Sequence, residues 1–185
     1  MRVIAGSARS LPLKTPPGLD TRPTTDRIKE TLFNILQPHL SGSVFLDLFS
    51  GSGGIGIEAL SRGAERAYFV EKDRRAAACI EDNLRFTKLS GRAVILQEEV
   101  QGALSRIREE AVDLIFMDPP YGKGLERQTL TLLESRTYVT RDTLIVVESA
   151  LETDFSDQEL EHCGFMVERE KKYKTNKHVF IRRRA

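Results

Sequence analysis

Short apolar runs alternate with longer segments of helical spacing along most of this 185-residue chain. Strands are expected near residues 44–48, 66–71, 92–97, 112–117, 142–148, 164–174 and 176–183, and helices near 53–62, 73–88, 100–109, 124–135 and 156–162. Alternation of this kind is typical of a parallel sheet with helices on both of its faces. The pattern therefore predicts an α/β fold whose ligands bind at the C-terminal ends of the strands.

The two ends of the chain depart from that alternation. The strands expected at 164–174 and 176–183 are joined too tightly for a crossover, so they should form an antiparallel hairpin. Near the N-terminus, residues 2–5 and 11–14 are expected to pair as a small hairpin. Apolar residues then recur at helical spacing from 28 to 36, with Thr24, Thr25 or Asp26 available as the N-cap. We therefore expect an N-terminal hairpin and helix at 1–40 and a main domain at 41–185.

The strand expected at 112–117 ends in Asp118-Pro119-Pro120-Tyr121. The prolines fix their φ angles and remove two backbone donors, so this corner is stiff and its carbonyl groups are free to accept from another molecule. The corner brings together a carboxylate, a carbonyl and an aromatic ring, which suits a flat ring that carries an NH2 group. A stiff turn in which Asp118 is only a cap is the alternative.

The strand expected at 44–48 runs into a glycine-rich loop, Ser50-Gly51-Ser52-Gly53-Gly54-Ile55-Gly56, and then into a helix. Glycines let a ligand approach the backbone, and the start of a helix offers free N–H groups, so this is the shape of a nucleotide site. The spacing Gly51-x-Gly53-x-x-Gly56, with the acid Glu71 further along the chain, also matches the dinucleotide fingerprint.

Asp47 stands at the strand end before these glycines and weighs against a dinucleotide. A carboxylate there would face phosphates, which is unfavourable, and it would favour a ligand with an ammonium or sulfonium group. S-adenosylmethionine carries both groups, has no phosphate and still has a ribose for Glu71. NAD remains the alternative cofactor.

The formal net charge of +1 conceals an uneven distribution. Residues 1–30 carry six Lys or Arg against three acids, and residues 169–185 carry eight against Glu170 alone. Basic charge at both ends predicts a surface that binds a polyanion, while solvated surface charge is the alternative. The candidate contacts are Arg9, Arg22, Arg27, Lys172, Lys174 and Lys177.

Other features narrow the class of protein. Cys79 and Cys163 are far apart and the three histidines are scattered, so no metal-binding spacing is expected. No apolar stretch reaches the length that spans a membrane, and the first residues lack the apolar core of a signal peptide. With both cysteines expected to stay reduced, these features indicate a cytoplasmic protein that binds neither a metal nor a membrane.

Taken in order, these motifs resemble those of the class I, Rossmann-like methyltransferases. Asp47 to Gly53 resembles their first motif, Glu71 their ribose-binding acid, and Asp118 to Tyr121 the DPPY motif of amino-group methyltransferases. The run from Thr21 to Asn34 (TRPTTDRIKETLFN) closely resembles the leader of the bacterial RsmD family, which are small-subunit (16S) ribosomal RNA guanine-N2 methyltransferases. With the basic C-terminal hairpin, the resemblance spans nearly the whole chain. It implies a seven-stranded, mostly parallel sheet that ends in the antiparallel hairpin.

The resemblance also implies roles for the motif residues. Asp118 and the Pro119 carbonyl would accept the hydrogens of a guanine amino group, and Tyr121 would stack on the base, so Asp118, Pro119, Pro120 and Tyr121 are the catalytic candidates. The candidates for binding S-adenosylmethionine are Asp47, Phe49, Ser50, Gly51, Gly53, Glu71, Lys72 and Glu99. A base inside a helix cannot reach this corner, so the target must be unpaired or flipped.

Two departures from the family pattern concern the edges of the site. The segment from Ser7 to Leu11 holds less Arg and Lys than the family hairpin usually does. Where an Asp is common among methyltransferases for the adenine amino group, this chain has Gln97-Glu98-Glu99-Val100. Glu99 or a backbone group can take that role, and a solvated helix start is the alternative.

We therefore expect an enzyme that methylates the N2 amino group of a guanine in 16S ribosomal RNA, within a small-subunit particle or an assembly intermediate. An N6-adenine methyltransferase on DNA or RNA would use the same corner and is the alternative enzyme. A catalytically silent RNA-binding protein with this fold is the alternative from another class.

Overall fold

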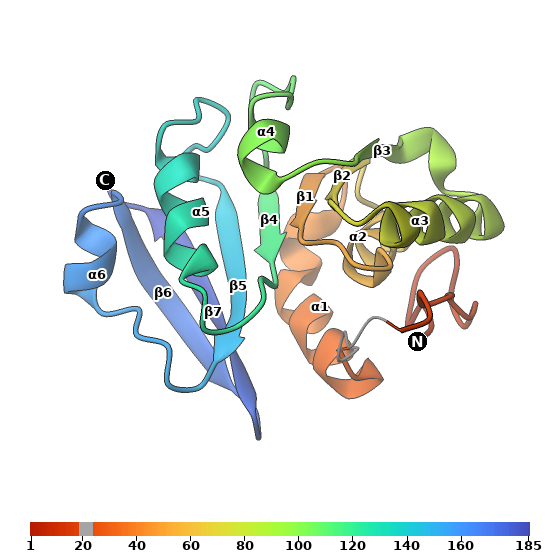
Figure 1. Ribbon diagram of the computed structural model, residues 1–185, viewed down its shortest axis with the longest axis horizontal. Coiled ribbons are helices and arrows are strands. Elements are labelled where there is room, and N and C mark those ends of the chain that lie inside the picture. Colours follow the sequence, from red (N-terminus) through yellow and green to blue (C-terminus); the bar gives the residue numbers. More distant parts are fainter. Residues whose placement is uncertain (19–23) are drawn as a thin grey trace.

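Apolar runs form the strands of one central sheet, as the sequence predicts. The computed structural model describes residues 1–18 and 24–185 (Figure 1). The strands are β1 (Val44–Leu48), β2 (Arg66–Val70), β3 (Ala93–Leu96), β4 (Leu114–Met117), β5 (Leu144–Ala150), β6 (Phe165–Lys172) and β7 (Asn176–Arg183). The helices are α1 (Asp26–Leu40), α2 (Gly54–Ser61), α3 (Arg74–Thr87), α4 (Val100–Leu104), α5 (Leu125–Glu134) and α6 (Asp157–Glu161), with a 3-10 turn, η1, at Ser90–Arg92.

The sheet has seven strands in the order β3-β2-β1-β4-β5-β7-β6. The first five in that order are parallel, and β7 is antiparallel to both β5 and β6. The predicted parallel sheet with a C-terminal antiparallel hairpin is therefore confirmed. The strand order reverses between β1 and β4, and ligands of such sheets bind where the C-terminal ends of those strands diverge.

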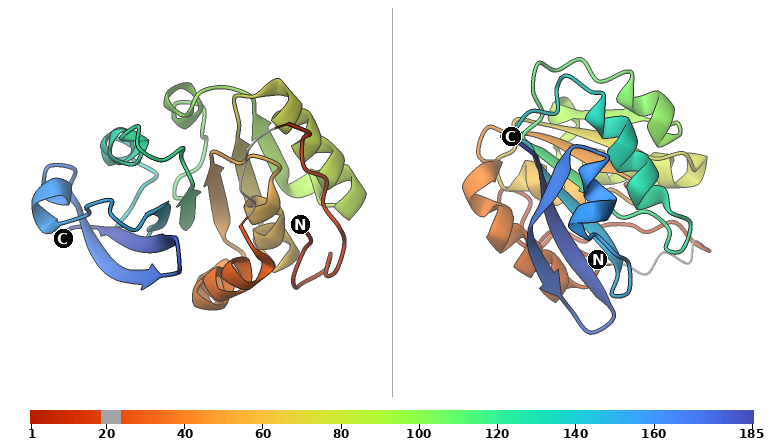
Figure 2. Two further views of the ribbon diagram at one scale, coloured as in Figure 1. Left: turned by 60° about the horizontal axis from the view of Figure 1, so that its bottom comes forward. Right: turned by 90° about the vertical axis from the view of Figure 1, so that its left-hand side faces the viewer.

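Two hydrophobic clusters cover the two faces of the sheet. Phe45, Phe116 and Phe180 pack with α1, α2, α3 and the N-terminal segment on one face, which we call the α1 face. Alternate residues, such as Leu46 and Met117, pack with α4, α5 and α6 on the opposite face, the α5 face. Figure 2 shows the two helical layers with the sheet between them.

The N-terminal hairpin is reduced to a single antiparallel bridge between Arg2 and Pro12. Its turn uses positive φ angles at Gly6 (87°) and Ser10 (68°), which leave little regular strand on either side. The helix that follows begins after Thr25, whose side chain accepts a hydrogen bond from the Ile28 N–H (3.3 Å), so one of the three predicted caps is confirmed.

The prediction for the helix at 100–109 is wrong at its C-terminal end, because α4 ends at Leu104. The N–H groups of Ser105 and Arg106 bond to carbonyl groups three residues earlier, which tightens the chain. After this tighter turn, Ile107 packs into the core of the α5 face.

A buried ionic cluster fastens the first residues and α1 to α2. Glu58 of α2 accepts hydrogen bonds from the N–H groups of Ile4 (2.8 Å) and Ala5 (3.0 Å). Its carboxylate also pairs with Lys29 of α1 (3.3 Å) and with Arg62 (2.8 Å), and all three charged side chains are nearly or wholly buried. Burial lowers the pKa of Lys29, and Glu58 opposes that shift. We call Lys29, Glu58 and Arg62 the N-terminal clamp.

The segment 1–40 shares its hydrophobic core with the sheet. Val3, Leu13, Leu32 and Phe33 are buried in the same cluster as the strand residues of the α1 face. The described part of this segment therefore packs as a layer of the main domain.

Candidate active site

The glycine-rich loop links the end of β1 to the start of α2. Phe49, Gly51 and Gly53 all have positive φ angles (59°, 56° and 84°), so the chain turns sharply before the helix begins. The Ser50 hydroxyl donates to the Asp47 carbonyl (2.7 Å), which fixes the turn. A Cβ atom on Gly56 would lie 2.4 Å from the Phe69 ring, so only glycine lets α2 pack this closely on β2.

Asp47 is buried beneath this loop, and one of its two carboxylate oxygens has no hydrogen-bond partner among the described residues. Its Oδ2 atom accepts from the Gly56 N–H (3.0 Å), while Oδ1 is buried and has no hydrogen-bond partner among the described residues. Burial raises the pKa of Asp47 to about 8; the Gly56 hydrogen bond opposes the rise and the negative charge of Glu71 adds to it. A carboxyl group in this situation suits a ligand that brings a positive charge or a donor.

Glu71 follows β2 and holds the loop from the other side. Its two carboxylate oxygens accept from the N–H groups of Gly51 (2.8 Å) and Asp73 (2.9 Å). Each oxygen keeps a second lone pair, so Glu71 is oriented and can still accept from a pair of hydroxyl groups.

Lys72 and Glu99 meet at the ends of β2 and β3. The Lys72 ammonium lies 3.3 Å from the Glu99 carboxylate, and both side chains are exposed. Glu99 stands at the N-cap of α4 without a capping hydrogen bond from its side chain. An exposed ion pair of this kind contributes about 0–1 kcal/mol, so it can open for a ligand at little cost.

The Asp118 corner follows β4, the strand beside β1. Pro119 is buried, Asp118 is partly buried, and Tyr121 is 44% exposed. Burial raises the pKa of Asp118 well above its ordinary value, and the carboxylates of Glu148, Asp47 and Glu126 add to the shift. The structure thus brings Asp47 and Asp118, which are 71 positions apart in the sequence, within electrostatic reach of each other.

The sequence interpretation missed Glu148 of β5. This residue is buried and is the largest charged contributor to the Asp118 pKa shift. Its carboxylate accepts from Asn176 (2.9 Å) and contacts the His178 ring (3.0 Å). The signal was available, because Glu148 is an acid near the end of an otherwise apolar strand, just as Asp47 and Asp118 are.

The predicted basic contacts fall into three groups. Arg9, Arg27, Lys172 and Lys174 are exposed, whereas Arg22 lies outside the described residues. Lys177 is buried, pairs with Glu170 (3.1 Å) and sits over the Phe155 ring, so it is corrected from a phosphate contact to an internal cation. A sequence shows the charge of Lys177 but not the acid and ring that cover it.

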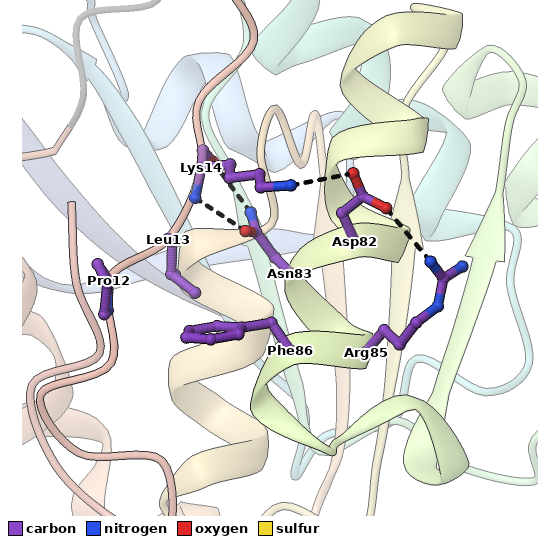
Figure 3. A pocket seen from close by; sticks show the side chains of 7 residues that line it. All are labelled: Pro12, Leu13, Lys14, Asp82, Asn83, Arg85 and Phe86. Carbon is purple, nitrogen blue, oxygen red and sulfur yellow. Dashed lines mark hydrogen bonds and ion pairs between the residues drawn. The ribbon is translucent and has the colours of Figure 1, made fainter.

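A cavity of about 460 Å³ lies between the N-terminal segment and α3 (Figure 3). Both basic residues that line it, Lys14 and Arg85, form ion pairs with the Asp82 carboxylate (3.5 Å each). Asn83 donates to the carbonyl groups of Lys14 and Ser52, which ties the N-terminal segment to the glycine-rich loop. The cavity therefore marks a structural junction beside the candidate site.

Among residues 1–18 and 24–185, no helix is long and apolar enough to cross a membrane. The same residues hold no group of three or more His, Cys, Asp or Glu side chains that could bind a metal ion.

The sequence matches the family described as conserved hypothetical protein 95 over residues 1–182. It is 40% identical over 159 residues to YlbH of Bacillus subtilis (strain 168), which covers 85% of this chain and 86% of that protein. It is also 40% identical over 154 residues to ribosomal RNA small subunit methyltransferase D of Escherichia coli (strain K12), covering 82% and 76% of the two chains. The solved structure of the Escherichia coli protein yhhF superimposes with a TM-score of 0.82 at 35% identity, covering 100% of this chain and 98% of that one.

Proposed function

The chain belongs to the family described as conserved hypothetical protein 95, and from this premise we propose that it methylates the N2 amino group of a guanine in small-subunit (16S) ribosomal RNA. The methyl donor in this proposal is S-adenosylmethionine. The observation that carries it is the pair of acids at the C-terminal ends of neighbouring strands, the buried Asp47 and the partly buried Asp118.

The acceptor groups around the glycine-rich loop suit S-adenosylmethionine. Asp47, with its unpaired Oδ1 atom, would accept from the ammonium group, and Glu71 would accept from the ribose hydroxyls. Phe49, Ser50, Gly51 and Gly53 would line the cofactor with backbone, while Lys72 and Glu99 lie where the adenine end is expected. A dinucleotide fits less well, because its phosphates would face the carboxyl group of Asp47.

The Asp118 corner would position the acceptor amino group. Asp118 and the Pro119 carbonyl accept its two hydrogens and aim the nitrogen lone pair, while the exposed Tyr121 ring stacks on a flipped base. S-adenosylmethionine supplies a methyl group that its sulfonium already activates. Asp118 would be ionised beside that positive charge and would bind a proton once the charge is lost, because its surroundings raise its pKa.

Ribosomal RNA is the substrate that the relatives and the charge distribution support together. The exposed Arg9, Arg27, Lys172 and Lys174 can contact phosphates without reading a sequence. Arg22 belongs to the same proposal, although it lies outside the described residues. We assign residues 1–40 to an RNA-binding extension and place the activity in the cytoplasm, on a small-subunit particle or an assembly intermediate.

Mass spectrometry of ribosomal RNA nucleosides from cells with and without the gene tests this function. We expect one N2-methylguanosine to disappear from 16S RNA and to return when the wild-type gene is restored, but not with an Asp118→Ala copy. Loss of an N6-methyladenosine instead would show an adenine methyltransferase. Unchanged nucleosides, or calorimetry that detects NAD and not S-adenosylmethionine, would overturn the proposal.

A further inference from the structure

Glu148 lies beside Asp118 at the C-terminal edge of the sheet. Met117 pairs with Val147 in parallel register, so Asp118 and Glu148 are the next residues along two neighbouring strands. Such strands run roughly 4.8 Å apart, which is within the span of a single base. Asp118 and Glu148 come two positions after Phe116 and Val146, which pack on the α1 face. Residues two apart along a strand share a face, so both acids lie on the α1 side.

The Glu148 carboxylate is held in one orientation by the C-terminal hairpin. Its Oε1 atom accepts from the Asn176 amide (2.9 Å), and its Oε2 atom lies 3.0 Å from His178 Nε2. The other ring nitrogen of His178 lies 3.1 Å from the Tyr173 hydroxyl, and the Phe116 ring packs edge-on against the imidazole. A carboxylate fixed in this way is ready to bind a ligand without a further loss of side-chain entropy.

The bonds to Asn176 and His178 use one lone pair on each oxygen and leave a second on each. Beside Glu148 lies the Asp118 carboxyl group, whose pKa is raised by the nearby charges of both Glu148 and Asp47. This edge of the site is rich in acceptors, so a base that enters it must bring donors. The two purines differ in this respect, because guanine presents adjacent N1–H and N2–H groups whereas adenine presents a bare N1 acceptor next to its amino group.

We propose that Glu148 selects guanine by accepting its N1–H while Asp118 accepts from the N2 amino group. An adenine in the same position would direct its N1 lone pair at a carboxylate that Asn176 and His178 keep in place. A site built around such a hydrogen bond rejects the analogue that lacks the donor. This inference rests on the proposed guanine-N2 activity and adds the residue that would exclude adenine.

The test compares guanine with 2-aminopurine at the mapped position of an RNA substrate. 2-Aminopurine keeps the reactive 2-amino group but has an acceptor at N1. We expect the wild-type enzyme to prefer guanine by about 10- to 100-fold in kcat/KM, as a lost hydrogen bond to a charged group implies. In Glu148→Gln, which keeps the size of the side chain, the preference should shrink to within about threefold.

Glu168→Gln is the matched control, because Glu168 is an exposed acid of the same hairpin that pairs with Arg182. It should keep the wild-type preference. The preference is a ratio within one enzyme preparation, so a smaller folded fraction of a variant does not alter it. A wild-type preference below threefold, or an unchanged preference in Glu148→Gln, would overturn the role of Glu148 and leave the proposed function intact. Failure of the wild type to methylate the guanine RNA would remove both.

Discussion

The N-terminal clamp and the strand-end carboxyl groups both place buried or partly buried acids on the α1 face, but they differ in how those acids are paired. In the clamp, Glu58 receives two backbone N–H groups and two cations, so every oxygen is satisfied. At the strand ends, Asp47 has one donor for two oxygens, and Asp118 is surrounded by other acids. The clamp is complete within the chain, whereas the strand ends need a partner from outside it.

The difference separates stability from function. A buried charge that is fully paired holds elements together, and removing one partner is costly. A buried charge that lacks partners lowers stability and is retained where a ligand supplies what is missing. Substitutions in the clamp should therefore lower stability and spare activity, whereas those at the strand ends should lower activity or ligand affinity and spare stability.

Asp118→Ala should have the largest effect on methyl transfer. We expect kcat to fall by at least about 10³-fold, or roughly 4 kcal/mol, because the amino group loses the acceptor that orients it. Cofactor affinity and melting temperature should stay close to the wild-type values. Single-turnover kinetics beside calorimetry would check this, and a variant that retains a tenth of the activity would contradict the positioning role.

Glu58→Gln should be the mirror image. It leaves Lys29 and Arg62 buried without their acid, so the free energy of unfolding should fall by roughly 3–5 kcal/mol. Turnover of the folded fraction should change little. Urea denaturation measures the first effect, and the exposed Glu65→Gln serves as control. If Glu58→Gln is as stable as the wild type, the clamp does not hold the segment.

Glu71→Ala stands between the two regions, because Glu71 binds the backbone of the loop and is also assigned to the ribose. S-adenosylmethionine affinity should fall by roughly 1.5–3 kcal/mol with the loss of charge-assisted hydrogen bonds. Glu71→Gln, which keeps an acceptor, should lose less. Titration calorimetry that finds full affinity in Glu71→Ala would end this assignment.

Asp47→Asn should stabilise the cofactor-free protein, in contrast to Glu58→Gln. The pKa of about 8 means that the folded chain holds a proton which the unfolded chain releases near pH 4. Wild-type stability should therefore fall as pH rises from about 4 to 8, and the substitution should remove that pH-dependent loss. Thermal melts across this range would show it. A wild-type curve parallel to that of Asp47→Asn would refute it.

The same contrast applies to cations and gives the smallest effects. Neutralising exposed Lys172 or Lys174 should lower the salt dependence of RNA binding by about one unit of slope each. Lys177, which is buried against Glu170, should instead lower the melting temperature when it is replaced by Met, without a change of slope. RNA affinity measured over a salt series distinguishes these outcomes. Unchanged slopes for Arg9, Arg27, Lys172 and Lys174 together would leave only solvated charge.

The parts that the sequence predicted are those in which local pattern and burial agree. Apolar runs predicted the strands, and the acids Asp47, Glu71 and Asp118 at their ends predicted the candidate site. The misses need contacts between distant segments. Glu148 is bound by Asn176 of β7, Lys177 lies over the Phe155 ring, and Glu58 accepts from the first residues of the chain. No local spacing encodes such pairs, so the pairing of buried charges had to come from the fold.

Because Glu58 binds the first residues of the chain, the presence of those residues and of an acid in α2 should be linked in evolution. The acid is tolerated inside an apolar helix because Ile4, Ala5, Lys29 and Arg62 supply its donors. A descendant that shed its first residues would keep a buried carboxylate with half of its donors gone. We therefore expect relatives that lose the segment around Ile4 and Ala5 to carry an apolar residue in place of the glutamate, and relatives that keep the glutamate to keep that segment as well.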